Sequence, residues 1–227
     1  MKYFLLFLLT TSTFSILKAQ ENHILIGDYN SLMVYAGIEV NFIKGEDNKI
    51  ILSHKNEDTS VFVYKIKNKV LKLKVAIDKK LSLGNIFVDV YYKNEIDEIN
   101  LFQGSTVLFQ DSISQTNLKI KAQEGSLLEG IVNTGKTSIE VASGGSVSLK
   151  GRSSVVEIKA STGGICLAEE LSSKQTKIQA SIGSVVYAKS SLLMDAKAST
   201  GAIIRVHGNP KKLILKTSLG GSIKQMK

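Results

Sequence analysis

The sequence is poor in the residues that cross-link or interrupt a chain. Its 227 residues include one cysteine, one proline and no tryptophan. A single cysteine excludes an intramolecular disulfide, so packing alone has to stabilise the fold. Cys166 lies between Ile165 and Leu167 with no candidate base nearby in the sequence, which favours a core thiol over a nucleophile. The lone Pro210 excludes a proline-rich linker between domains.

Arginine and aromatic residues are also scarce. The formal net charge is +9, yet Arg152 and Arg205 are the only arginines, and Tyr187 is the only aromatic residue after position 110. Bidentate and stacking contacts with nucleic acids favour arginine and aromatic side chains. The composition therefore argues against a nucleic-acid partner. Dispersed lysines suit anionic glycans or lipid head groups instead.

The first residues have the pattern of an export signal. Lys2 precedes the apolar run 3–9, and a more polar stretch ends at Ala19. This pattern predicts a signal peptide over residues 1–19, with cleavage after Ala19. The alternative is an N-terminal membrane anchor, which needs a longer apolar run. No later segment is apolar enough to be a transmembrane segment, so we expect an exported protein of the periplasm, the cell surface or the secreted fraction.

The strongest pattern is a repeat in the C-terminal half. Residues 180–206 contain the phrase Ala-Ser-x-Gly twice, and related phrases recur every 18 to 21 residues. One unit of this length cannot bury an apolar face alone, so such repeats indicate coils that stack on one another. Glycine can adopt positive φ at a sharp corner, and corner glycines are expected at Gly104, Gly125, Gly145, Gly163, Gly183, Gly201 and Gly220.

Each unit alternates apolar and polar side chains before its glycine. Odd positions are apolar, as at Ile120, whereas even positions are polar, which is the pattern of a half-buried strand. A second strand is expected to begin two residues after each glycine. One unit is out of step, since Ile139 and Val141 fall at even positions before Gly145. We interpret this as a one-residue slip or bulge next to that glycine.

These features predict an all-β fold, a single-stranded right-handed β-helix (β-solenoid) of about 19-residue coils. A hydrophobic content of 43% is consistent with a folded chain. Residues 99–227 would form the solenoid repeats. Residues 20–98 contain strand-like runs separated by turn residues such as Lys67-Asn68-Lys69. They would form an irregular N-terminal β region that caps the solenoid, continuous with it in one domain.

Several phrases resemble a known family, the putative auto-transporter adhesin, head GIN domain family. They are the phrases GIEVNFIKGEDNKIIL, KNKVLKLKV and FVDVYYKNEIDEINLFQGSTV, with the later Ala-Ser-x-Gly steps. The resemblance extends from about Asp28 to Ile223, although the phrases at Gly104 and Gly125 depart from the family's Gly-Ala-Ser. It implies an exported, adhesin-like β-helical protein of the cell envelope, typical of Bacteroidetes. It implies no catalytic or binding residues.

Catalytic and metal-binding patterns are not evident in the sequence. Glycoside hydrolysis needs two carboxyl groups close together, but Asp111 and Glu170 share a repeat position three coils apart. The three histidines, His23, His54 and His207, lack metal-ligand spacing. We therefore expect a non-enzymatic protein without a cofactor or a bound metal.

Lysines at one repeat position form the candidate ligand site. Lys121, Lys159, Lys197 and Lys216 each stand four residues before a glycine, which places them on one face of the solenoid. This face either binds an anionic cell-surface or extracellular polysaccharide, or is a solvated face that keeps a flat sheet soluble. The alternative function is a structural or assembly module of the envelope, which would form a homo-oligomer or contact another envelope component.

Overall fold

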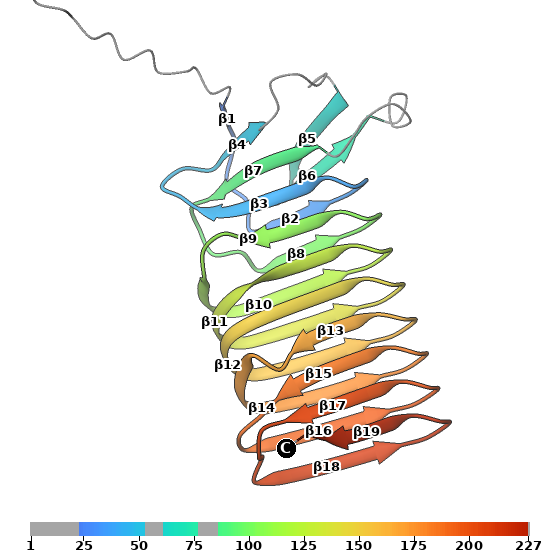
Figure 1. The fold of residues 1–227 in the computed structure, drawn as a ribbon. Helices are drawn as coiled ribbons and strands as arrows, with labels where there is room; N and C mark the ends of the chain where they lie inside the picture. Colours follow the sequence, from blue (N-terminus) through green and yellow to red (C-terminus); the bar gives the residue numbers. More distant parts are fainter. Residues whose placement is uncertain (1–22, 53–60, 77–85, 227) are drawn as a thin grey trace, which may run out of the picture.

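The computed structural model describes residues 23–52, 61–76 and 86–226, which form strands joined by turns (Figure 1). The expected signal peptide, residues 1–19, and His54 lie outside these ranges. In the described part of the chain, no helix is long and apolar enough to cross a membrane. The prediction of an all-β solenoid with coils of about 19 residues is confirmed.

The described residues form nineteen strands. The N-terminal strands are β1 (His23–Leu25), β2 (Ser31–Val34), β3 (Glu39–Lys44), β4 (Lys49–Leu52), β5 (Phe62–Lys67), β6 (Val70–Val75) and β7 (Phe87–Tyr92). The shorter repeat strands are β8 (Glu98–Leu101), β9 (Thr106–Phe109), β10 (Ile113–Ala122), β13 (Ile165–Ala168), β14 (Leu171–Ala180), β15 (Val185–Lys189), β16 (Leu193–Ala198), β17 (Ile203–His207), β18 (Lys212–Thr217) and β19 (Ser222–Gln225). Two longer strands, each bent through a corner, are β11 (Leu127–Val141) and β12 (Ser146–Ala160).

Each repeat coil has two faces that meet at a turn on one edge and a corner on the other (Figure 1). Face A contains β8, β10, β14, β16 and β18, with the C-terminal parts of β11 and β12. Face B contains β9, β13, β15, β17 and β19, with the N-terminal parts of β11 and β12. Neighbouring coils pair in parallel and in register, so equivalent side chains lie above one another.

The turns between face A and face B are built alike in successive coils. In the turn 181–184, Ile182 and Gly183 both have positive φ, and the N–H of residue 184 donates to the carbonyl of residue 181. Two central residues with positive φ are characteristic of type I′ turns, which require glycine or a residue that tolerates the left-handed region. Glycines with positive φ occupy the second central position at Gly37, Gly104, Gly125, Gly144, Gly163, Gly183, Gly201 and Gly220.

The third predicted corner glycine was wrong by one residue. Gly144, with φ of 73°, occupies the turn position that the sequence pattern had placed at Gly145. Counted from Gly144, Ile139 and Val141 fall at odd positions, and both are buried. The inferred slip or bulge is therefore absent from this unit. Gly145 instead passes close to the neighbouring coil, where a Cβ would lie 2.4 Å from the Ala122 carbonyl oxygen.

Backbone hydrogen bonds also join the turns to one another. From Gly37 to Gly201, the N–H of each turn glycine donates to the carbonyl of the first central residue in the next turn, as from Gly125 to Ser143 at 3.1 Å and from Gly183 to Thr200 at 3.0 Å. The parallel ladder therefore continues through the turns. We call this edge the turn column, and it fixes the spacing of all coils at this side of the molecule.

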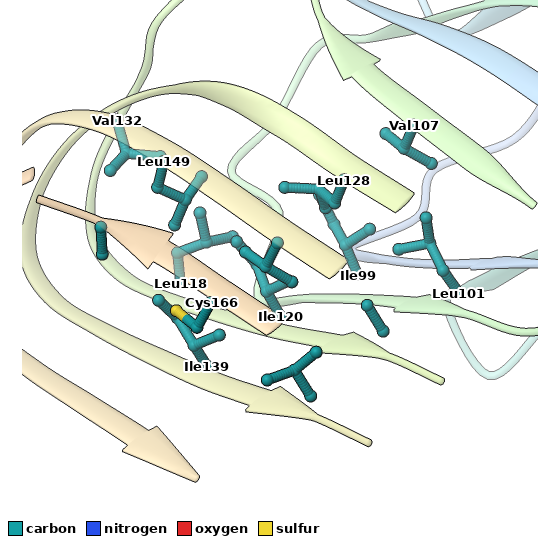
Figure 2. Packing of buried hydrophobic residues seen from close by; sticks show 14 of the residues in the cluster. Ile99, Leu101, Val107, Leu118, Ile120, Leu128, Val132, Ile139, Leu149 and Cys166 are labelled. Carbon is teal, nitrogen blue, oxygen red and sulfur yellow. The ribbon is translucent and has the colours of Figure 1, made fainter. Parts of the chain in front are cut away.

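A continuous apolar column fills the interior between the two faces (Figure 2). Face A contributes a row in which Ile120, Ile139, Ile158 and Ile178 stack in register. Face B contributes Cys166, which pairs with Val147 and Val186 in the adjacent coils. All of these side chains are at most 2% exposed. The column stabilises the stack because each coil covers the apolar side chains of its neighbours.

The N-terminal region is partly solenoid and partly cap. β2 and β3 form a coil that pairs in parallel with β8 and β9. On its other side, β6 and β7 also pair in parallel with this coil. Antiparallel strands β5 and β4 then pair with β6 and β7. The hairpin between β5 and β6 turns at Asn68 and Lys69, which both have positive φ.

Coil length varies at the corner opposite the turn column. Because Ala168 pairs with Ala188 and Gln175 pairs with Leu193, residues 169–174 form this corner in one coil and residues 189–192 form it in the next. In the following coil, Lys189 pairs with His207 and Leu193 with Lys212, so its corner is again longer. Extra residues are accommodated here without shifting the two faces out of register.

Candidate anion-binding surface

The four predicted lysines lie in one row on the outer side of face A. The row follows the strand pairing from coil to coil, and Lys121, Lys159 and Lys197 each stand between two buried neighbours on their own strands. In the repeat coils the row, in order along the solenoid axis, is Asn100, Lys121, Glu140, Lys159, Gln179, Lys197 and Lys216. It continues through Met33 and Lys72 in the N-terminal region. The structure therefore brings the lysines onto one face but separates the first of them from the rest with a glutamate.

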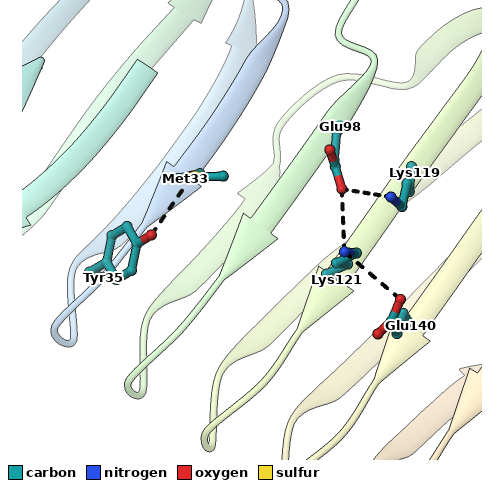
Figure 3. A network of polar contacts seen from close by, with 6 residues as sticks. All are labelled: Met33, Tyr35, Glu98, Lys119, Lys121 and Glu140. Carbon is teal, nitrogen blue, oxygen red and sulfur yellow. Dashed lines mark hydrogen bonds and ion pairs between the residues drawn. The ribbon is translucent and has the colours of Figure 1, made fainter. Parts of the chain in front are cut away.

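Lys121 is neutralised by acidic neighbours (Figure 3). Its Nζ lies 3.8 Å from Glu98 Oε1 and 4.0 Å from Glu140 Oε2. Glu98 also forms a shorter ion pair with Lys119 at 3.0 Å, and this hydrogen bond raises the pKa of Lys119. At partly exposed positions such pairs contribute little to stability. They do cancel the positive potential at the N-terminal end of the row.

The remaining lysines are free of ion pairs with the described residues. Lys159, Lys197 and Lys216 have no carboxylate within ion-pair distance in the described ranges, and all three are exposed. Two residues after each, a serine also points outward, giving the local sequences KAS, KAS and KTS. The coil between the first two has QAS at this place. We call this surface the Lys–Ser strip, and it consists of Lys159, Ser161, Gln179, Ser181, Lys197, Ser199, Lys216 and Ser218.

The Lys–Ser strip is shallowly hollowed. One depression of about 380 Å³ lies between Lys159 and Lys197 and is lined by Ser161, Ser181 and Gln179, with Glu140 at its end. A second of about 420 Å³ lies between Lys197 and Lys216. From the spacing of paired strands, the three lysines span about 14 Å along the solenoid axis. The strip thus offers cations and hydrogen-bonding groups to an extended ligand parallel to that axis.

Sequence reasoning missed the acidic residues that interrupt the row of lysines. Glu98 and Glu140 could have been noticed, because Glu140 stands four residues before Gly144, but the wrong anchor at Gly145 hid the equivalence. The serines of the row are exposed or partly exposed, whereas other serines, such as Ser126 and Ser184, are buried and donate to backbone carbonyls of the preceding coil.

The candidate catalytic residues are not brought together. Asp111 Oδ2 accepts a hydrogen bond from the Lys44 N–H at 3.0 Å, whereas Glu170 forms an ion pair with Lys150 at 2.9 Å. Cys166 is fully buried, and burial raises the pKa of its thiol to about 12. Among the described residues, no three His, Cys, Asp or Glu side chains are arranged to bind a metal ion.

Comparison with known families matches most of the chain. A family model described as "putative auto-transporter adhesin, head GIN domain" matches residues 28–210. No curated protein matches the chain.

Solved structures share this fold at low sequence identity. A putative adhesin from Bacteroides fragilis has a TM-score of 0.83 at 13% identity, over 91% of this chain and 96% of that chain. A putative adhesin from Parabacteroides merdae has a TM-score of 0.68 at 16% identity, over 91% and 95%. A putative lipid binding protein from Parabacteroides distasonis has a TM-score of 0.67 at 13% identity, over 92% and 96%. At these identities the likeness concerns the fold.

Proposed function

Because this chain belongs to the putative auto-transporter adhesin, head GIN domain family, we propose that it is an exported, surface or extracellular adhesin-like protein without enzymatic activity. Its ligand is an anionic cell-surface or extracellular polysaccharide, held along face A. The family description and the solved putative adhesins support the adhesin-like role. The separated carboxylates and the buried thiol support the absence of catalysis.

The observation that carries the proposed ligand class is the Lys–Ser strip. Lys159, Lys197 and Lys216 are exposed and lack ion pairs with the described residues, so their charges are available to a ligand. The serine beside each lysine adds a hydroxyl that can donate to or accept from sugar hydroxyls and carboxylates. The lysines are regularly spaced along the solenoid axis, which suits a polymeric ligand. Many weak contacts to one polymer add up to a higher affinity, because the contacts are linked through the same molecule.

The test is binding of residues 20–227 to immobilised polygalacturonate and dextran sulfate at about 0.15 M salt. The variant K159Q/K197Q/K216Q should bind about tenfold more weakly than the unmodified protein, since three exposed charges at about 0.5 kcal/mol each contribute about 1.5 kcal/mol. Lys121 is paired with acids, so K121Q alone should change binding little.

A matched control removes three lysines from the opposite end of the solenoid. Lys65, Lys67 and Lys69 lie on the hairpin of β5 and β6, and K65Q/K67Q/K69Q removes the same total charge. Equal losses in the two triple variants would show a general charge effect and contradict a site on the Lys–Ser strip. Binding of neutral dextran as strongly as dextran sulfate would contradict the ligand class.

The second candidate is an assembly module of the envelope, and the C-terminal coil favours it. Leu213 and Leu215 of β18 occupy inward positions, yet they are 37% and 41% exposed because no further coil of the described residues covers them. On face B, Ile165, Val185 and Ile203 point outward in three adjacent coils and form a short apolar row. Sedimentation of residues 20–227 over a range of concentrations should show a homo-oligomer if this candidate is right. A monomer at all concentrations would exclude self-assembly.

A further inference from the structure

A groove at the corner of the solenoid is separate from the Lys–Ser strip. It has a volume of about 460 Å³ and crosses five successive coils, which corresponds to about 19 Å along the axis at the spacing of paired strands. Its floor lies over residues 189–191, the shortest corner among its neighbours, and the longer corners on either side form its walls. The recess therefore results from the difference in coil length.

The chemistry of the groove is uniform. Its lining contains no carboxylate, no aromatic ring and no aliphatic side chain larger than a threonine methyl. Three cationic side chains line it, those of Arg152, Lys174 and Lys189. All three are exposed and have no ion pair with the residues that the structure describes. The remaining side chains are hydroxyls and amides.

Internal hydrogen bonds hold the floor of the groove in place. Ser173 Oγ donates to the Lys189 carbonyl at 2.8 Å and contacts Thr176 Oγ1 at 2.6 Å. Ser190 Oγ is 2.9 Å from the Lys174 carbonyl oxygen, and Thr134 Oγ1 donates to Ser153 Oγ at 2.9 Å. The serines and threonines in these contacts are at most 7% exposed. Their hydrogen bonds order the floor before a ligand arrives, which lowers the entropic cost of binding.

Other polar groups of the groove are free to bind a ligand. Asn133, Ser154, Ser172 and Asn209 line it and form no side-chain hydrogen bond with any described residue. Amides and hydroxyls on the rim, with cations beside them, match a ligand that carries many hydroxyls and spaced negative charges. A peptide would need apolar pockets or an open strand edge, and a single-stranded nucleic acid would need stacking aromatics. The groove has none of these.

We propose that this corner groove binds a short acidic segment of a glycan, carboxylated or sulfated, laid along the solenoid axis. The inference rests on the proposed function, since it assigns a second site to the same class of ligand. The groove and the Lys–Ser strip lie near opposite ends of the face A strands, roughly 16 Å apart along β14 by the rise per residue. Their effects on binding should therefore be separable.

The test uses oligosaccharides too short to benefit from the repeated contacts of the strip. Tetragalacturonate and a sulfated tetrasaccharide are titrated calorimetrically into residues 20–227, with maltotetraose as the neutral probe. R152Q/K174Q/K189Q should bind the acidic probes at least about tenfold more weakly, whereas K159Q/K197Q/K216Q should bind them nearly as well as the unmodified protein. A second variant, S154W, keeps every charge but fills the groove, and it should also lose binding.

The outcomes distinguish this inference from the proposed function. If R152Q/K174Q/K189Q and S154W bind the acidic tetrasaccharides as tightly as the unmodified protein, the groove is not the binding site. The proposed function then depends only on the binding of polymers to the Lys–Ser strip. Failure of the unmodified protein to bind either acidic tetrasaccharide also overturns the groove. Equal binding of maltotetraose overturns the requirement for charge. Circular dichroism and thermal unfolding show whether each variant is folded, and K65Q/K67Q/K69Q again controls for total charge.

Discussion

At the scale of single residues, the turn column contains strained positions. The first central residue of each turn has positive φ, and in three turns it is a β-branched residue, Thr162, Ile182 or Thr200, with φ near 50°. The left-handed region costs a residue with a branched Cβ about 1–2 kcal/mol, whereas asparagine tolerates it. Hydrogen bonds to the coils on either side offset the conformational cost of these turns.

The first prediction is that I182N stabilises the protein. The substitution creates the Asn-Gly sequence preferred in type I′ turns, and Ile182 is already 53% exposed, so little burial is lost. We expect the free energy of unfolding in urea to rise by about 1 kcal/mol. Leu192 is 40% exposed and is not among the positive-φ residues, so L192N is the control and should give no gain. A destabilised I182N would contradict the assignment of strain.

The second prediction concerns Cys166 and alkaline pH. Burial raises the pKa of its thiol from 9.0 to about 12, so the folded state keeps a proton that the unfolded state loses. The stabilising contribution is fully present below the unfolded pKa and is lost as the pH rises from about 9 towards 12. At about pH 10.5 the loss should be about 2 kcal/mol.

The measurement compares the unmodified protein with C166A in urea at about pH 7.5 and about pH 10.5. C166A removes the titrating thiol, so the difference in stability between the two proteins should narrow at the higher pH. Lysine and tyrosine titrations are common to both proteins and cancel. A difference that stays constant with pH would show that the thiol does not titrate between these values.

At the scale of strands, equivalent positions differ in what covers them. Ile178 of β14 and Leu215 of β18 stand five residues before their turn glycines, and both point inward. Ile178 lies between paired strands on both sides and is fully buried. Leu215 belongs to the last described coil and is 41% exposed. Side chains at the same repeat position therefore contribute differently to the free energy of unfolding in the two coils.

The third prediction follows from this pair. I178A should lower the free energy of unfolding by about 3 kcal/mol, because it leaves a cavity in a packed column. L215A should cost about 1 kcal/mol or less, since the side chain is already partly hydrated. Urea unfolding of both variants measures the difference. Equal costs would indicate that something in solution covers β18, and the oligomer measured by sedimentation should then depend on Leu215.

Strand patterns explain which parts of the fold could be predicted. The alternation of apolar and polar residues identified the strands. The inward row of isoleucines could be predicted because stacked coils bury the same type of residue at equivalent positions. The register of the third unit was missed because Gly144 and Gly145 are adjacent and only the backbone conformation distinguishes them. The corner groove could not be found from any one strand, since it depends on the relative lengths of neighbouring coils.

At the scale of the whole molecule, stability depends on contacts between neighbouring coils. A solenoid of this kind behaves as a one-dimensional stack, in which each coil contacts only the coils above and below it. The lysine row shows that the charge at one coil cannot be inferred from the sequence of that repeat alone. Its four members share a position, but Glu98 and Glu140 neutralise Lys121 from adjacent coils. The net charge around a residue in one coil thus depends on residues in the adjacent coils.

The fourth prediction is that one whole coil can be removed. Deletion of residues 145–163 joins Gly144 to Gly164. Gly144 is the third residue of its turn, and Gly164 is the fourth residue of the turn in the next coil. The parallel register is then restored, so the shortened protein should fold cooperatively with reduced stability and be shorter by about 4.8 Å. Circular dichroism, urea unfolding and small-angle scattering measure this.

A half-coil deletion is the matched control. Removing residues 145–154 places a face A segment where face B should begin, so inward and outward side chains exchange places and the ladder is broken. This variant should fail to fold or aggregate. If it were as stable as the whole-coil deletion, the stacking described above could not be the source of stability.

The uneven corners have a consequence for how such proteins diversify. The turn column and the apolar interior constrain every coil to the same outline, but the corner tolerates the gain or loss of residues, as the stretches 169–174 and 189–192 show. An insertion or deletion there deepens, fills or moves the recess while the scaffold persists. A lineage could thus change what it recognises through the length of its corners, with no substitution in the surfaces that hold the fold together.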